Sequence, residues 1–188
     1  MQIIFYGSEG SGKTTQAKLL AEKLKLPHII SGDIVRKYAT SDKGLLGDVC
    51  RKALKEGKYV DDLEMFVLWK QRLSEPDTKK GWVIDGFPRT LDQIRFLEEK
   101  IKLDSKKIDA VFYLELAENI AVERLLKRAR RNPDGTLHDT PAIIKKRLQM
   151  YKKQEKNVLD FYRKKALLKV IDGSKTIEQI HQNILRCL

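Results

Sequence analysis

The feature that most constrains this chain is a glycine-rich segment directly behind its first apolar run. The run "IIFY" leads into "GSEGSGKTTQ", residues Gly7 to Gln16. The segment has the spacing G-x-x-x-x-G-K-[ST] of a phosphate-binding loop. Its glycines let the backbone point several N–H groups into one concavity, and the helix expected from Lys13 onwards adds the positive end of its dipole. The sequence therefore predicts a strand, a loop and a helix that hold phosphate between them.

Two side chains of the loop suit a nucleoside triphosphate that carries Mg²⁺. Lys13 supplies a positive charge to the β- and γ-phosphates, and Thr14 offers a hydroxyl to the metal. A carboxylate for the same metal is expected from Asp85, which ends the apolar run "WVID". The carboxyl end of a parallel strand is where such a sheet delivers side chains to a ligand, and we expect Asp85 to act through water.

Short apolar runs alternate with longer amphipathic ones along the whole chain. We expect strands at Gln2–Tyr6, His28–Ser31, Trp82–Asp85, Ala110–Glu115 and Leu168–Ile171. We expect helices at Lys13–Leu24, Gly32–Ala39, Gly44–Glu56, Leu63–Leu73, Leu91–Glu99, Asn119–Arg130, Pro141–Arg163 and Thr176–Arg186. Strands that are apolar throughout and separated by helices indicate a parallel sheet covered on both faces. The predicted fold class is α/β, with three layers and a parallel five-stranded sheet in one domain over residues 1–188.

Composition narrows the range of partners and compartments. The net charge of +12 favours an anionic partner such as a nucleotide, a nucleic acid or an anionic membrane, and a solvated basic surface is the alternative. Cys50 and Cys187 lie far apart and form no metal-binding spacing, which fits a reducing compartment. Since no apolar run approaches 18 residues and the start lacks a signal-peptide pattern, we expect a cytoplasmic protein with no membrane contact.

Six further segments follow the loop in a fixed order. They are "SGDIVR", "GKYVDD", "DGFPRTLDQ", "ERLLKRARR", "IKKRL" and "IDGSK". With the loop, they resemble the adenylate kinase family of nucleoside monophosphate kinases along nearly the whole chain. The resemblance implies the P-loop nucleoside monophosphate kinase fold, with a monophosphate-binding insertion near residues 31–60 and a short lid near residues 128–140.

The resemblance also implies a set of site residues. The ATP-binding residues would be Gly10, Ser11, Gly12, Lys13, Thr14, Thr15, Arg124, Arg128 and Lys175. The AMP-binding residues would be Ser31, Arg36, Lys58, Tyr59, Val60, Gly86, Phe87, Pro88, Arg89, Gln93 and Arg147, with Gln93 reading the adenine. The catalytic residues would be Lys13, Arg89, Arg124, Arg128 and Arg147. Phosphoryl transfer between two anions requires positioning and cations rather than a protein nucleophile, and arginine grips phosphate bidentately.

The sequence departs from the family pattern in the loop and in the lid. Glu9 replaces a small residue or proline, and we expect it either to face solvent or to pair with a cation of the lid. Thr136 stands where the family carries a second lid arginine. Either Arg130 or Arg131 takes the place of the missing arginine, or catalysis relies on fewer arginines. A turn expected over residues 132–135 would bring the side chain of Arg131 close to Thr136. His138 is expected to be an exposed turn residue, and the lid lacks the cysteine quartet that would hold a structural zinc.

The implied reaction is the reversible, Mg²⁺-dependent transfer ATP + AMP ⇌ 2 ADP. Gln93 favours AMP as the acceptor. One alternative keeps the fold and the chemistry but uses UMP or CMP as the acceptor, or a broader range of triphosphates as the donor. The second alternative is a P-loop protein that binds nucleic acid, suggested by the charge. That alternative would need a cluster of stacking aromatic residues, and only 7% of the residues are aromatic. We therefore expect ATP and AMP as small-molecule partners, no specific nucleic acid, and a monomer.

Overall fold

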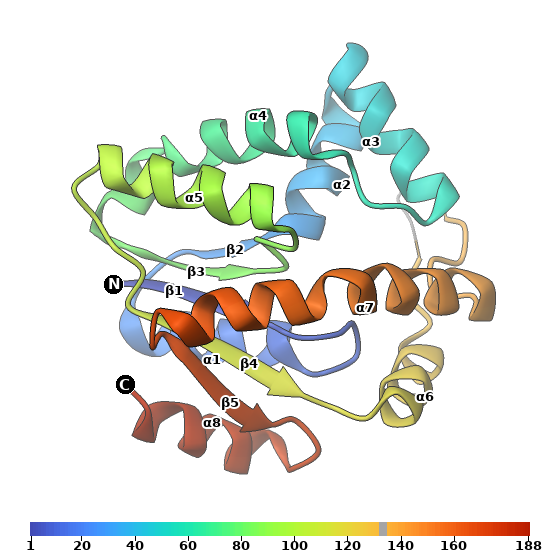
Figure 1. Cartoon of the computed structure of the whole chain (residues 1–188). Coiled ribbons are helices and arrows are strands. Elements are labelled where there is room, and N and C mark those ends of the chain that lie inside the picture. Colours follow the sequence, from blue (N-terminus) through green and yellow to red (C-terminus); the bar gives the residue numbers. More distant parts are fainter. Residues whose placement is uncertain (132–134) are drawn as a thin grey trace.

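A five-stranded parallel sheet forms the centre of the molecule (Figure 1). The structure is a computed structural model that describes residues 1–131 and 135–188. Its strands are β1 (Gln2–Tyr6), β2 (His28–Ile30), β3 (Trp82–Asp85), β4 (Ala110–Glu115) and β5 (Leu168–Asp172), in the order β2-β3-β1-β4-β5. In the register of β1 with β3, Phe5 pairs with Asp85. The carboxyl ends of these two strands therefore deliver the glycine-rich loop and Asp85 to the same edge of the sheet.

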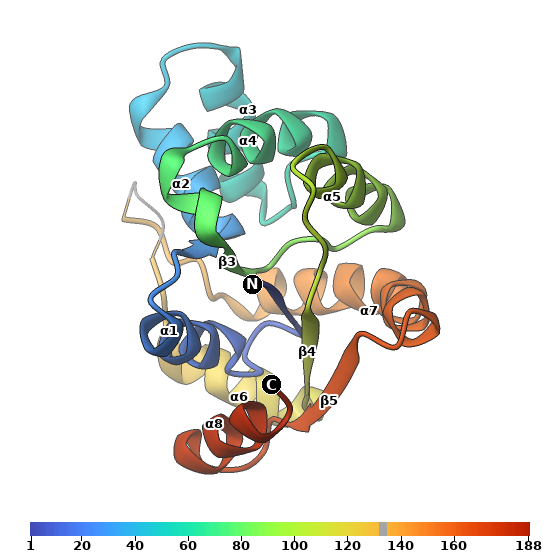
Figure 2. The same cartoon turned by 90° about the vertical axis from the view of Figure 1, so that its left-hand side faces the viewer.

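Helices cover both faces of the sheet (Figures 1 and 2). They are α1 (Lys13–Leu24), α2 (Ser31–Ser41), α3 (Leu45–Glu56), α4 (Asp62–Leu73), α5 (Leu91–Leu103), α6 (Glu118–Arg128), α7 (Pro141–Lys164) and α8 (Ile177–Arg186). Helices α1 and α8 pack on one face of the sheet, and α4, α5 and α7 pack on the other. The predicted three-layer α/β fold with a parallel five-stranded sheet is confirmed.

The alternation of side chains along the strands produces one apolar core on each face. In β1, Ile3 and Phe5 pack with α1 and α8, whereas Ile4 and Tyr6 pack with the opposite layer. Because each of these residues is at most 4% exposed, both faces of the strand are buried. This double burial explains why the strands are apolar throughout instead of alternating with polar residues.

The strand and helix boundaries differ from the sequence-based expectation in a few places. Ser31 begins α2 instead of ending β2, and α5 continues four residues beyond Glu99 to Leu103 because Ile101 still faces the core. A 3₁₀-helix at Pro76–Lys80 was not expected. Helix α6 ends at Arg128 rather than Arg130, because Ala129 adopts a left-handed conformation with φ of 46°. This early end directs the chain after Arg128 toward the carboxyl edge of the sheet.

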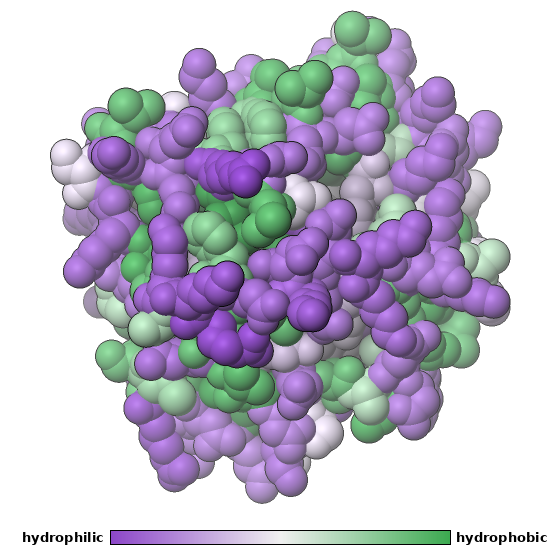
Figure 3. Space-filling model, in the orientation of Figure 1, coloured by the Kyte–Doolittle hydropathy of each residue, from purple (hydrophilic) through white to green (hydrophobic). Residues whose placement is uncertain are grey.

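The molecular surface carries the excess of charged residues. Hydrophilic side chains cover most of the face shown in Figure 3, and apolar groups appear between them. Over the part of the chain that the structure describes, no helix combines the length and the apolar character needed to cross a bilayer.

Candidate active site

A cavity of about 530 Å³ lies at the carboxyl edge of the sheet. The segments that follow β1, β2 and β3 all reach it, together with residues of α3, α4, α6 and α7. Most predicted site residues line it: Gly10, Gly12, Lys13, Thr14, Thr15, Ser31, Arg36, Lys58, Tyr59, Val60, Asp85, Gly86, Arg89, Gln93, Arg124, Arg128 and Arg147. The fold therefore gathers one continuous set of cations and loop amides from segments that are distant in sequence.

The glycine-rich loop has the backbone conformation that its sequence predicts. Gly10 has φ of +86°, and a Cβ atom there would lie 2.7 Å from the carbonyl oxygen of Ala121. Gly12 has φ of +91° and caps α1 at its N-terminus. Lys13 donates from Nζ to the carbonyl oxygen of Ser8 at 3.0 Å, so its amine curls back over the loop. Burial lowers the pKa of this amine, while Asp85 and Glu9 oppose that effect.

Thr14 and Asp85 form a pair suited to a divalent cation. The Thr14 hydroxyl donates to Oδ2 of Asp85, whose side chain is 1% exposed. The other carboxylate oxygen, Oδ1, is buried and makes no hydrogen bond to the described residues. A buried carboxylate oxygen with spare acceptor capacity beside a threonine hydroxyl is the oxygen chemistry that Mg²⁺ prefers. The residues present therefore fit the metal that the loop motif implies.

Three arginines are fixed around the cavity by contacts that orient their guanidinium groups. Arg89 donates from Nε to the carbonyl oxygen of Gly86 at 2.7 Å, and its guanidinium lies 4.0 Å from the ring centroid of Tyr59. Arg36 pairs with Asp33 at the start of α2. Arg124 donates to the carbonyl oxygen of Gly173 at 3.0 Å, which ties α6 to the loop after β5. Each guanidinium is held in place by protein acceptors before any ligand binds.

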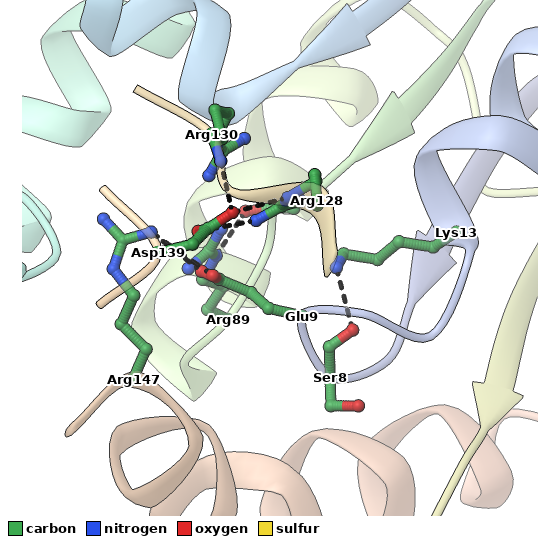
Figure 4. A network of polar contacts seen from close by, with 9 residues as sticks. Ser8, Glu9, Lys13, Arg89, Arg128, Arg130, Asp139 and Arg147 are labelled. Carbon is green, nitrogen blue, oxygen red and sulfur yellow. Dashed lines mark hydrogen bonds and ion pairs between the residues drawn. The ribbon is translucent and has the colours of Figure 1, made fainter. Parts of the chain in front are cut away.

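Asp139 organises two further arginines, a role that the sequence reasoning missed. Its carboxylate accepts from Nε and Nη2 of Arg128 at 2.8 and 2.9 Å and from the backbone N–H of Arg130 at 3.0 Å (Figure 4). Burial, with Arg128 and Arg36 nearby, lowers the pKa of Arg130 to about 10, so Arg130 remains charged at neutral pH. The signal available in the sequence was an acidic residue at the end of a stretch that begins strongly basic.

The structure selects Arg130 rather than Arg131 as the arginine near the cavity. Arg130 lines the cavity, whereas Arg131 is exposed and donates to the carbonyl oxygen of Gly135 at 2.8 Å. Of the turn expected over residues 132–135, residues 132–134 lie outside the described residues. Thr136 is exposed. His138, expected to be an exposed turn residue, is instead 1% exposed, and burial together with Arg147 and Arg130 lowers its pKa to about 4.

Gln93 is held by a partner that the sequence reasoning also missed. Its Oε1 accepts from the backbone N–H of Arg89 at 2.7 Å, and its Nε2 donates to Oδ1 of Asp62 at 2.7 Å. Asp62 in turn accepts from the hydroxyl of Thr90 at 2.9 Å. The two contacts fix the orientation of the amide, and each end keeps one further hydrogen-bonding position. Gln93 therefore presents a defined donor and acceptor to the cavity.

Four of the predicted site residues are not among those that line the cavity. Phe87 is 1% exposed and stacks on Trp69 with ring centroids 4.4 Å apart, so its ring belongs to the core. Ser11 is fully buried. Lys175 is exposed, and its Nζ lies 3.7 Å from Oδ2 of Asp172. Pro88, which follows Phe87, is not among the lining residues either. Glu9 and Arg130, which the sequence analysis left open, line the cavity, and the lining residues that it did not name are Ile30, Gly32, Asp33, Val35, Leu54, Met65 and Leu125.

Glu9 takes neither of the two expected orientations, because its side chain is only 14% exposed and its partner Arg147 belongs to α7 and not to the lid expected at residues 128–140. Both of its carboxylate oxygens accept from Nη1 of Arg147, at 3.2 and 3.3 Å (Figure 4). Burial alone would raise the pKa of Glu9, but Arg147, Arg89, Lys13 and Arg130 outweigh it and lower the pKa to about 2. A carboxylate thus lies inside the cluster of cations that lines the cavity.

The chain matches known proteins over almost its full length. A family model described as adenylate kinase matches residues 5–167. "Adenylate kinase 1" of Nostoc sp. is 36% identical over 179 residues, which cover 95% of this chain and 94% of that protein. "Adenylate kinase" of Cyanothece sp. is 39% identical over 174 residues (93% and 88% of the two chains), and that of Archaeoglobus fulgidus is 34% identical over 209 residues (98% and 96%). The chain therefore belongs to the adenylate kinase family.

Proposed function

We propose that the protein catalyses ATP + AMP ⇌ 2 ADP. The observation that carries this proposal is the composition of the cavity. The phosphate loop with Lys13 lines it together with Gln93, Arg36 and arginines from several other segments. Such an arrangement suits two nucleotides that meet through their phosphates. The proposal is tested by measuring ADP formation from ATP and AMP and, separately, the formation of ATP and AMP from ADP.

The loop and the arginines divide the work of holding the two phosphate groups. The amides of the loop and the Lys13 ammonium would hold the phosphates of the donor, with Arg124 and Arg128 beside them. Arg36 and Arg89 would hold the phosphate of the acceptor. Arg147 would lie over the transferred group, where negative charge is spread over three oxygens. Because these groups are already oriented by protein contacts, they stabilise that charge with little reorganisation.

Mg²⁺ would be held by the Thr14 hydroxyl and, through water, by Asp85. When bound, it would neutralise charge on the donor phosphates and polarise them toward transfer. What supports this role is the buried Oδ1 of Asp85, which makes no hydrogen bond to the residues that the structure describes. We further propose that residues 31–60 form the monophosphate-binding insertion and residues 128–140 the lid, since both segments supply cavity-lining arginines from outside the sheet.

The acceptor base would be read by Gln93. Its amide, fixed by Asp62 and by the Arg89 backbone, keeps one N–H and one lone pair for a base. These match the N1 acceptor and the N6 donor of adenine. Cytosine carries an acceptor and a donor in the same order but on a smaller ring, so that it reaches Gln93 less well, and uracil carries them in the reverse order.

Replacing Gln93 with alanine is expected to raise KM for AMP and to reduce the difference in kcat/KM between AMP and CMP. Loss of two hydrogen bonds of about 1 kcal/mol each corresponds to roughly tenfold or more in kcat/KM for AMP. The measurement is kcat/KM for AMP, CMP and UMP with ATP held constant. Gln71→Ala is the matched control, because Gln71 is exposed and accepts from the Tyr38 hydroxyl instead of lining the cavity. If the ratio of kcat/KM for AMP to kcat/KM for CMP is unchanged in Gln93→Ala, Gln93 is no reason to assign AMP as the acceptor.

A further inference from the structure

Glu9 places a negative charge where a phosphate ligand has to bind. The residue lies in the loop between β1 and α1 and lines the same cavity as Lys13 and Arg89. Its side chain is 14% exposed, and that of its partner Arg147 is 8% exposed. Figure 4 shows the carboxylate extending from the loop toward Arg147, away from the Lys13–Ser8 contact.

The cations around Glu9 explain why a carboxylate is stable there. Lys13, Arg89, Arg130 and Arg147 all interact electrostatically with it. Like charges brought together out of bulk water repel one another strongly, and a buried charge without a partner is costly. The other acidic residues that line the cavity are occupied elsewhere, since Asp33 pairs with Arg36 and Asp85 accepts from Thr14. Glu9 is therefore the carboxylate that faces Arg147 among the described residues of this cavity.

A carboxylate and a phosphate compete for the same donors. Both present oxygen acceptors that guanidinium groups bind through charge-assisted hydrogen bonds. Arg147 already gives Nη1 to both oxygens of Glu9. A phosphate that takes this guanidinium must either displace the carboxylate or bind next to a negative charge at close range.

We propose that Glu9 is an intramolecular anion that holds Arg147 in the ligand-free protein and is displaced by the phosphate of a bound nucleotide. Glu9 then has two opposing effects. It stabilises the cation cluster while the cavity is empty of ligand, and it weakens the binding of every phosphate that uses Arg147. The proposal rests on the proposed function only in taking phosphate as the ligand, and it does not depend on which base is accepted.

The test compares Glu9→Gln with Glu118→Gln. Glutamine keeps the size of the side chain and removes its charge. Glu118 pairs with Lys152, which lies on α7 as Arg147 does. Both side chains of this pair are about half exposed, and neither residue lines the cavity, so the control makes the same charge change at the surface. The probe is inorganic pyrophosphate, titrated by calorimetry at fixed ionic strength.

Glu9→Gln is expected to bind pyrophosphate about tenfold more tightly than the unaltered protein, the effect of removing one opposing charge-assisted contact. Glu118→Gln is expected to stay within about twofold, as exposed pairs contribute little. Without ligand, the Tm of Glu9→Gln should fall, and the Tm gain with saturating pyrophosphate should exceed that of the unaltered protein. Tighter binding is an effect that a merely structural role of Glu9 would not produce.

An equal or higher Kd for pyrophosphate in Glu9→Gln would overturn the proposal. If glutamine at position 9 prevents folding, Glu9→Ala provides the comparison, because it removes both the charge and the competing oxygens. The outcome is separable from the proposed function. Tight pyrophosphate binding without AMP phosphorylation would overturn the proposed reaction alone, whereas AMP phosphorylation with unchanged Kd values would overturn this proposal alone.

Discussion

Replacing Lys13 with alanine is expected to lower kcat by at least about 100-fold while the fold stays intact. Lys13 is 9% exposed, and its ammonium contacts the Ser8 carbonyl oxygen of the phosphate loop at 3.0 Å. A preorganised charge of this kind contributes on the order of 3 kcal/mol to transition-state stabilisation. The measurement is kcat for ADP formation at saturating ATP and AMP, with circular dichroism to verify folding.

The matched control for Lys13→Ala is Lys18→Ala. Lys18 is also on α1, but its side chain is 69% exposed and lies 3.9 Å from Glu22. This control should keep kcat within about twofold, since surface pairs of this type contribute little. A well-folded Lys13→Ala protein that keeps about half of its activity would refute the assignment of the phosphate site.

Replacing Arg130 with alanine is expected to lower kcat more than tenfold, whereas Arg131→Ala should leave it within about twofold. The two residues are neighbours of the same type, so each serves as the control for the other. Arg130 lines the cavity and has its backbone N–H fixed by Asp139, whereas Arg131 is exposed. Charges in a water-poor site stabilise a developing anion far more than exposed charges do.

The opposite pattern, with Arg131→Ala impaired and Arg130→Ala unaffected, would show that the wrong arginine was assigned. If neither change affects kcat, no other arginine replaces the one that the family carries at the position of Thr136. Arg124, Arg128 and Arg147 would then supply the remaining positive charge. Comparison of kcat at saturating substrate with kcat/KM separates an effect on transfer from one on binding.

Most of the fold follows from local patterns in the sequence. The apolar runs mark β1, β3 and β4 at the residues where the structure has them, because strands buried on both faces need no polar residues. The glycine spacing predicts the loop because few other residues adopt the positive φ of Gly10 and Gly12. Boundaries set by distant contacts were harder to predict, as in α5, where Ile101 packs in the core.

The site was less accessible to sequence reasoning where one side chain depends on another far along the chain. The pairing of Glu9 with Arg147 joins residues 138 positions apart, and that of Gln93 with Asp62 spans 31 positions. The choice between Arg130 and Arg131 depends on the left-handed conformation of Ala129, which ends α6 early. No residue pattern marks alanine for that conformation.

We propose that two nucleotides, one of them AMP, exchange a phosphoryl group in this cavity. The most direct test is a panel of initial rates for AMP, CMP, UMP and GMP, each with ATP and Mg²⁺. We expect transfer to AMP with the highest kcat/KM, at least about tenfold above CMP and UMP, because these lose one or two base contacts. A higher kcat/KM for CMP or UMP than for AMP, or no transfer to any monophosphate, would contradict the proposal.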